Sequence, residues 1–316
     1  MTRTRTWQRL VHAGAALIAL ALPAALSAQR THVLIVAGLS GDPAFRRTFD
    51  ASVKATAAVA SAKWGVSDSS LFLLTEDSVA TSWSRGRSTR ENIGQAFTRL
   101  SRRVAPGDVV FVFLVGHGSG EGPTSKVNLP GPDATASEYA AWIRGFSAQQ
   151  VVFVNAASGS GDFVPVLAGP GRVIVTATRS AVERNASVFG QHFAEAIGSD
   201  NADADKNGRL SVMEAFRYAR SAVATSYETT NRMLTEHAVV SDSVRAATIT
   251  FGTTATVASP RIAALIAERQ ALESQVAALR ARKRTMTAAE YDTALETLLL
   301  AIAEKTQAIK AAGGAS

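Results

Sequence analysis

Seven consecutive apolar residues, VVFVFLV at 109–115, constrain the fold of this chain more than any other stretch. A strand whose every side chain is apolar is buried on both faces, which is typical of a parallel sheet covered by helices. Similar short runs recur along the chain and predict strands at 32–38, 71–76, 108–116, 151–155 and 172–178. Between and after them, helical patterns predict helices at 43–63, 89–104, 137–146, 187–198 and 212–227. This alternation predicts an α/β domain over residues 31–245, with a mostly parallel sheet and helices on both faces.

The composition changes after residue 245. Residues 246–260 are rich in Thr, Ala and Ser, which indicates a linker with room for one more strand. Beyond it, apolar residues recur at heptad spacing, and TAAE at 287–290 is a capping box that begins a second helix. The pattern predicts a helical hairpin or short coiled coil over 261–312. Two arrangements stay open: packing within one chain, or a homo-oligomer formed through these C-terminal helices.

The first 28 residues have the features of a secretory signal. Three arginines and no acidic residue come first, an apolar stretch follows, and the small residues AALSA precede a cleavage point after Ser27 or Ala28. The apolar part is too short to favour a stable membrane span, and a retained N-terminal anchor is the alternative. The sequence therefore predicts an exported protein, periplasmic or secreted, without a stable span once the signal is removed.

The net charge of +7 is concentrated at the two ends of the chain. Three of the positive charges lie in the predicted signal, and the segment 261–284 holds six basic residues against two acidic ones. A solvated helix face explains this segment more simply than contact with nucleic acid, so no nucleic-acid partner is predicted. The chain has no cysteine, which excludes disulfide bonds and thiolate chemistry. A core of this size does not need disulfide bonds for its stability.

Two predicted strands end in glycine-rich sequences that carry candidate catalytic residues. The strand at 108–116 runs into GHGSG, which contains His117, and the strand at 151–155 runs into NAASGSG, which contains Ser158. Parallel α/β sheets place their chemistry at the carboxyl ends of strands. A histidine between glycines is open to solvent, although spacing alone supports a structural loop histidine equally well.

The order of these motifs resembles that of the caspase/legumain-like cysteine peptidases, and legumain-type members are the most similar. The matching sequences are VFLVGHGSG (112–120), FVNAASGSGDF (153–163) and RVIVTATRS (172–180). The resemblance implies a caspase-like fold over about residues 31–245. It also implies that His117 is a general acid/base. The backbone N–H groups of Gly118 and of the nucleophile residue would then form an oxyanion hole.

The sequence departs from that family at the nucleophile, where Ser158 stands in the position of the catalytic cysteine. A thiol with a pKa of about 8.5 ionises readily. A serine hydroxyl instead needs a base in direct contact, itself oriented by a third group, for which Glu121 and Asp162 are candidates. A second departure is Gly159, which stands where legumain has an acidic pocket residue, so asparaginyl cleavage is not predicted. Nearby, Glu183 and Arg184 either line a pocket or form a surface ion pair.

Three functions are compatible with these patterns. The favoured one is a non-catalytic binding or regulatory module, a pseudopeptidase that recognises a peptide or protein ligand. The first alternative is an active hydrolase that uses a His117–Ser158 dyad. The second is a structural assembly protein that acts through its C-terminal helices.

The sharpest local motif is DADKNGRLSVME at 203–214, which matches the EF-hand calcium loop in full. Gly208 would make its sharp turn, and Arg209 would contribute its backbone carbonyl. The predicted Ca²⁺ ligands are Asp203, Asp205, Asn207, Arg209, Ser211 and Glu214. Because the preceding helix is predicted to end at Gly198, we expect a lone loop that stabilises the domain. The alternative is an Asp-rich helix N-terminus with Ser211 as its cap.

Overall fold

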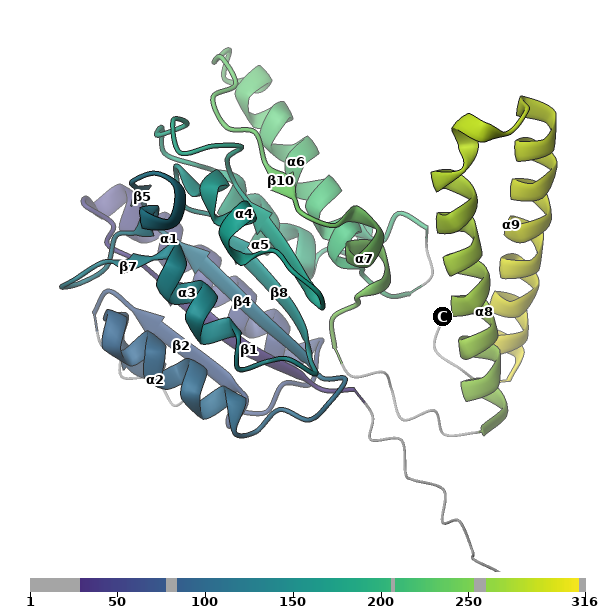
Figure 1. Cartoon of the computed structure of the whole chain (residues 1–316), viewed down its shortest axis with the longest axis horizontal. Coiled ribbons are helices and arrows are strands. Elements are labelled where there is room, and N and C mark those ends of the chain that lie inside the picture. Colours follow the sequence, from purple (N-terminus) through teal and green to yellow (C-terminus); the bar gives the residue numbers. More distant parts are fainter. Residues whose placement is uncertain (1–28, 78–83, 206–207, 253–259, 313–316) are drawn as a thin grey trace, which may run out of the picture.

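A largely parallel sheet forms the centre of the molecule (Figure 1). The computed structural model describes residues 29–77, 84–205, 208–252 and 260–312, so the predicted signal sequence and Asn207 lie outside these ranges. Within them, seven strands pair in the order β10-β9-β8-β4-β1-β2-β3, and each neighbouring pair is parallel except β9 with β10. The strands are β1 (Thr31–Ala37), β2 (Leu71–Thr75), β3 (Ser84–Arg87), β4 (Val109–Val115), β8 (Gln150–Asn155), β9 (Arg172–Thr176) and β10 (Val239–Val240).

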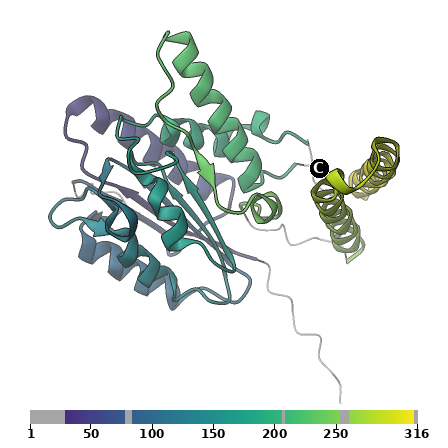
Figure 2. The ribbon, with the colours of Figure 1, turned by 45° about the horizontal axis from the view of Figure 1, so that its top comes forward.

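Helices cover both faces of this sheet (Figures 1 and 2). On one face lie α1 (Pro43–Ala62), α5 (Phe189–Gly198) and α6 (Val212–Thr229). On the other face lie α2 (Arg90–Ser101), α3 (Ala136–Ile143) and α4 (Phe163–Leu167). The predicted α/β architecture, with a mostly parallel sheet between helices, is therefore confirmed.

The apolar run VVFVFLV at 109–115 forms β4, and all seven of its residues are buried. Alternate residues contribute to the two cores because successive side chains of a strand point to opposite faces. Val109, Phe111, Phe113 and Val115 pack with α1, α5 and α6, whereas Val110, Val112 and Leu114 pack with α2, α3 and α4. A continuous apolar run is thus required where two helical layers meet one strand.

The five strands predicted from apolar runs are present within one or two residues of their expected ends. Three short elements carry no such run: β3 at one edge, β10 at the other, and a separate small antiparallel sheet. That second sheet consists of β5 (Gly118–Ser119), β6 (Lys126–Val127) and β7 (Ala134–Thr135). It follows directly from the His117 corner and holds the backbone of Gly118 in place.

The α/β domain extends beyond residue 245, into the segment expected to be a linker. Helix α7 (Ser243–Thr248) buries Ala246, and Ile249 packs in the same core as α6. Thr250 forms an antiparallel bridge with Ser211, and Gly252 exchanges hydrogen bonds with the Thr31 hydroxyl. Residues 246–252 therefore complete the domain, while residues 253–259 lie outside the described ranges.

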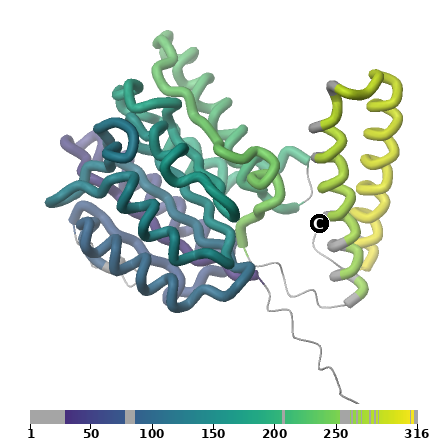
Figure 3. Tube along the Cα trace, in the orientation of Figure 1, coloured from purple at the N-terminus to yellow at the C-terminus, as the bar shows by residue number. Residues whose placement is uncertain are grey.

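Two long helices follow, α8 (Pro260–Ala281) and α9 (Ala288–Ala311), and they pack side by side (Figures 1 and 3). Val276, Leu279, Tyr291 and Ile309 are buried, and Lys305 of α9 forms an ion pair with Glu268 of α8 at 2.6 Å. Leu299 and Leu300 stay largely exposed on α9. Whether this pair is a coiled coil stays a prediction. In the described parts of the chain, no helix has both the length and the apolar character needed to cross a membrane.

Two buried tyrosines provide a test of the core. The hydroxyl of Tyr139 is fully buried and has no hydrogen-bond partner among the described residues, and burial raises the pKa of this tyrosine. The hydroxyl of Tyr227 instead contacts Thr235 and Glu236, each at 3.2 Å. We expect Tyr139→Phe to raise the free energy of unfolding by about 1 kcal/mol and Tyr227→Phe to lower it by a similar amount. Urea denaturation of both variants measures the difference, and equal losses would contradict the unpaired state of the Tyr139 hydroxyl.

Candidate functional site

Three neighbouring strands end at the candidate site. In the sheet, β4 lies between β1 and β8, with Ala37 paired with Val115 and Leu114 paired with Asn155. Ser40 follows the end of β1, His117 follows the end of β4, and Ser158 follows the end of β8. The amide N–H of Gly38 donates to the Val115 carbonyl at 2.8 Å, which joins the first two exits. The topology therefore places the predicted histidine and serine at one edge of the sheet.

His117 is held by a carbonyl and two aromatic rings. Its Nε2 lies 3.2 Å from the Ser40 carbonyl oxygen, and because a carbonyl only accepts, Nε2 carries the hydrogen. In the neutral ring, Nδ1 is then the nitrogen available to accept a proton. The rings of Phe45 and Phe49 from α1 meet the imidazole edge-on, with centroids 4.7 and 5.4 Å away. The histidine is thus oriented, with the Ser40 carbonyl as its orienting group.

Ser158 is buried and its hydroxyl has a different partner. The residue is only 2% exposed, and its Oγ accepts a hydrogen bond from the backbone N–H of Gly118 at 3.3 Å. No hydrogen bond joins Ser158 to His117, although both residues are within the described part of the chain. The serine hydroxyl therefore contacts the predicted oxyanion-hole donor, and no base contacts the hydroxyl.

Neither carboxylate predicted as a third group contacts His117. Asp162 accepts hydrogen bonds from the N–H groups of Gly122 at 2.7 Å and Ala181 at 3.2 Å, so it holds two loops together. Glu121 is exposed, and its nearest charged neighbour is Arg184 at 3.7 Å. Sequence reasoning missed Ser40, which lies in GLSG three residues after β1. The available signal was its position at a strand end next to β4, since a backbone carbonyl carries no mark in the sequence.

The Ser158 corner requires glycine at two positions. Gly159 has φ +62°, in the left-handed region, where a side chain is strained. A Cβ on Gly118 would lie 2.5 Å from the Ser158 carbonyl oxygen and 2.9 Å from that of Lys126. An acidic residue at position 159, as legumain has, would thus be strained on this backbone.

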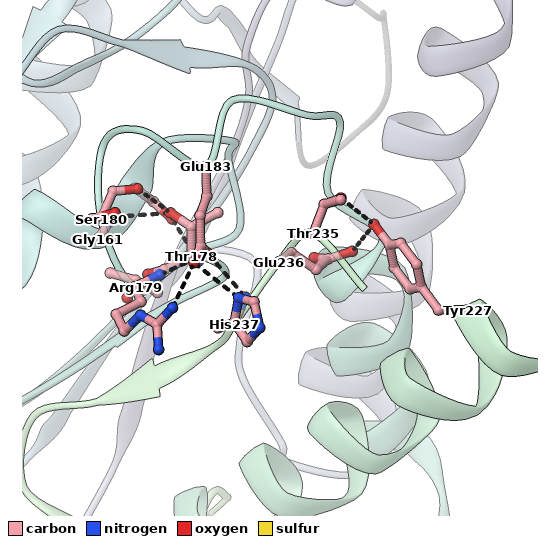
Figure 4. A network of polar contacts seen from close by, with 11 residues as sticks. Gly161, Thr178, Arg179, Ser180, Glu183, Tyr227, Thr235, Glu236 and His237 are labelled. Carbon is pink, nitrogen blue, oxygen red and sulfur yellow. Dashed lines mark hydrogen bonds and ion pairs between the residues drawn. The ribbon is translucent and has the colours of Figure 1, made fainter. Parts of the chain in front are cut away.

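The loop after β9 covers the corner and connects it to a wider polar network (Figure 4). The N–H of Gly161 donates to the Thr178 hydroxyl at 3.0 Å, and the N–H of Gly159 donates to the Glu183 carbonyl at 2.9 Å. The Glu183 carboxylate in turn accepts from His237 Nδ1 at 2.9 Å and lies 3.6 Å from the Arg179 guanidinium. Glu183 is therefore paired with His237 and Arg179, and not with its neighbour Arg184.

The predicted calcium loop brings three carboxylates together. One oxygen each of Asp203, Asp205 and Glu214 lies within 4.8 Å of the other two. With Ca²⁺–oxygen bonds of 2.3–2.6 Å, ligands on opposite sides of one ion are at most about 5 Å apart, so this spacing suits the ion. Gly208 has φ +76° and donates its N–H to Asp203 at 2.8 Å, which makes the sharp turn.

The remaining predicted ligands have mixed positions. Ser211 is the N-cap of α6 and forms a capping box with Glu214, whose Oε2 accepts from the Ser211 hydroxyl at 2.7 Å. The two predictions for this segment, metal loop and helix cap, thus involve the same two side chains. Arg209 can offer only its carbonyl, and burial lowers the pKa of its guanidinium. Asn207 lies outside the described residues.

In comparisons with known proteins, no family model matches the chain, and no curated protein matches its sequence.

The contact between Gly118 and the Ser158 corner can be tested by adding one methyl group. We expect Gly118→Ala to lower the free energy of unfolding by about 2–3 kcal/mol, because the clashing atoms are backbone carbonyls that cannot rotate away. Gly169→Ala is the matched control, since its Cβ would meet nothing closer than 3.9 Å. Thermal and urea unfolding measure both, and equal stability of the two variants would contradict the close approach.

Proposed function

We propose that this chain is an exported, non-catalytic relative of the caspase/legumain-like peptidases that acts as a binding module stabilised by one calcium ion. One observation carries the proposal: the Ser158 hydroxyl is buried and hydrogen-bonded to Gly118 N–H, while His117 is bonded elsewhere. A serine nucleophile needs a base within hydrogen-bond reach to be activated. A serine hydroxyl, unlike a thiol, is too weak an acid to become a nucleophile without such a base.

Other features of the corner support a silent site. An oxyanion hole must present its N–H donors to the substrate's developing charge. In this chain the N–H of Gly118, one of the two predicted donors, is engaged by the Ser158 hydroxyl itself. Attack of Ser158 on a substrate would therefore require this hydrogen bond to be exchanged. The orientation of His117 by Ser40 is the one feature that favours the alternative, a working hydrolase.

Active-site labelling distinguishes the two. We expect no labelling of the full chain by a fluorophosphonate and no cleavage of a peptide library, because the hydroxyl is neither exposed nor activated. Ser158→Ala and His117→Ala are the test variants. Ser160→Ala is the matched control, since Ser160 is equally buried and bonds to Thr178 at 3.3 Å. Labelling that disappears in Ser158→Ala and His117→Ala but persists in the control would establish the hydrolase. Cleavage by Ser158→Cys alone would support a peptidase scaffold that has lost its chemistry.

The calcium part of the proposal rests on the donor set. Asp203, Asp205 and Glu214 offer hard oxygen ligands, which Ca²⁺ prefers, and three carboxylates close together repel one another without a cation. Glu214 is only 8% exposed, which increases the cost of that repulsion. A bound Ca²⁺ would supply charge neutralisation and fix the start of α6. We assign it a structural role.

A melting experiment with and without calcium tests this assignment. At a calcium concentration of 100 times the Kd, the free energy of unfolding should rise by about 2.7 kcal/mol, and Glu214→Gln should abolish the rise. The matched control is Glu138→Gln, because Glu138 forms the same capping box with Thr135 at the start of α3 but lies in no carboxylate cluster. A calcium shift that survives in Glu214→Gln, or is absent from the native protein, would contradict the site.

A further inference from the structure

A cavity of about 440 Å³ lies away from the Ser158 corner, between α6, the start of α5 and residues 234–238. This volume is within the range of small-ligand sites, which combine an apolar lining with a few placed polar groups. The apolar lining includes Phe189, Val223 and Leu234. The charged and polar lining includes Arg217, Arg220, Glu236 and His237. These charged and polar residues belong neither to the Ser158 corner nor to the predicted calcium loop.

Two arginines of α6 line the cavity. Arg217 and Arg220 lie three residues apart on α6, and both are exposed. In the described ranges, no carboxylate lies within ion-pair distance of either guanidinium. Residues at i and i+3 share one side of a helix, so the two positive charges face the same volume. The Arg220 guanidinium lies over the Phe216 ring at 5.7 Å, and this contact leaves its positive charge without a carboxylate. Two guanidinium groups that form no ion pair beside a cavity favour an anionic ligand, and the planar fork of arginine suits a carboxylate.

The carboxylates near the cavity are already satisfied. Glu236 is 3% exposed and accepts hydrogen bonds from four donors: the Ser187 and Tyr227 hydroxyls and the N–H groups of Val188 and Phe189. These donors and the N-terminus of α5 offset its negative charge. Glu183 is paired with His237 and Arg179, as described above (Figure 4). Glu236 lines the cavity, but neither carboxylate forms an ion pair with Arg217 or Arg220.

His237 adds a third polar group with a defined orientation. Its Nδ1 lies 2.9 Å from a Glu183 carboxylate oxygen, and its backbone N–H donates to the other oxygen at 3.0 Å. An ionised carboxylate only accepts, so Nδ1 carries the hydrogen and Nε2 is left over. Nε2 has no hydrogen-bond partner among the described residues, and the side chain lines the cavity. In this tautomer Nε2 is an acceptor that can take an N–H or O–H group of a ligand.

We propose that this cavity binds a carboxylate carried by an apolar peptide, with Arg217 and Arg220 on the carboxylate and the apolar lining on the adjoining side chain. A peptide is favoured because exposed apolar residues adjoin the cavity. Leu234, which lines the cavity, is 37% exposed, and Met233 beside it in the chain is 84% exposed. Such side chains can bury the residues that precede or follow the carboxylate. This inference rests on the proposed binding function and names the ligand class.

Fluorescence anisotropy with three labelled pentapeptide mixtures tests the inference on the full chain. All positions are drawn from Ala, Leu and Val. The first mixture has a free C-terminal carboxylate, the second is amidated, and the third is amidated with one internal glutamate. We expect the second mixture to bind at least tenfold more weakly than the first or the third. Comparison of the first with the third shows whether the cavity prefers a C-terminal carboxylate or a glutamate side chain. The double variant Arg217→Gln/Arg220→Gln should bind the free-carboxylate mixture at least tenfold more weakly than the native protein does. In this variant, amidation of the peptides should have no further effect on affinity.

Two controls separate the cavity from general charge and from folding. Arg99→Gln removes an exposed arginine from α2, on the opposite face of the sheet, and should leave binding unchanged. Leu234→Ser should weaken all three mixtures alike. Equal binding of the free and amidated mixtures, or no binding of any mixture at about 1 mM, would overturn the inference. If calcium still raises the melting temperature and Ser158 stays unlabelled in the same sample, only the cavity assignment fails, and the proposed function stands apart from it.

Discussion

The burial of β4 on both faces is the constraint on which the rest of the structure depends. A strand apolar at all seven positions must lie between two helical layers, and its neighbours β1 and β8 must be parallel to it. Three strand exits then meet at one edge, with Ser40, His117 and Ser158 on them. The glycine-rich corners follow from this crowding, because the segments that leave these adjacent strands lie close to one another. Gly118 shows it most directly, since it has no space for a Cβ between two backbone carbonyls.

The same crowding accounts for the state of the candidate nucleophile. Ser158 follows β8 into a turn that Gly159 can make and most residues cannot. The loop after β9 closes over this turn through Thr178 and Glu183. The hydroxyl is left in a buried place where the nearest donor is Gly118 N–H. A hydrogen bond to a buried polar group adds modestly to the free energy of unfolding, whereas a buried polar group without a partner lowers it by more. The contact of the Ser158 hydroxyl with Gly118 therefore stabilises the closed loop. The closed loop and the hydrogen bond between Gly118 and the Ser158 hydroxyl are therefore one arrangement.

Much of the fold could be predicted from the sequence, and less of the site. Long apolar runs and helical periodicity located the main strands and helices because burial dictates both patterns. The short elements β3 and β10 carry no such pattern, since Ser84–Arg87 and Val239–Val240 are held by pairing with a neighbour. The sequence brought His117 and Ser158 to one edge, but the direction of the Ser158 hydroxyl depends on loop packing. Ser40 acts through its backbone carbonyl, and the hydrogen bond between Glu183 and His237 joins residues 54 positions apart, so local patterns could not identify either contact.

The loop at 203–214 has a structural position that explains why it would stabilise the protein. Its residues Leu210 and Val212 pair through the backbone with Phe251 and Ile249, the last segment of the domain. Phe251 stacks on Trp64 and meets Phe111 of β4 edge-on, at 4.6 and 5.2 Å between ring centroids. The loop thus attaches the end of the domain to its central strand. A cation that relieves repulsion among the loop's carboxylates would stabilise this closure as well as the start of α6. Because α6 also carries Arg217 and Arg220, the predicted calcium loop and the proposed carboxylate cavity depend on the position of one helix.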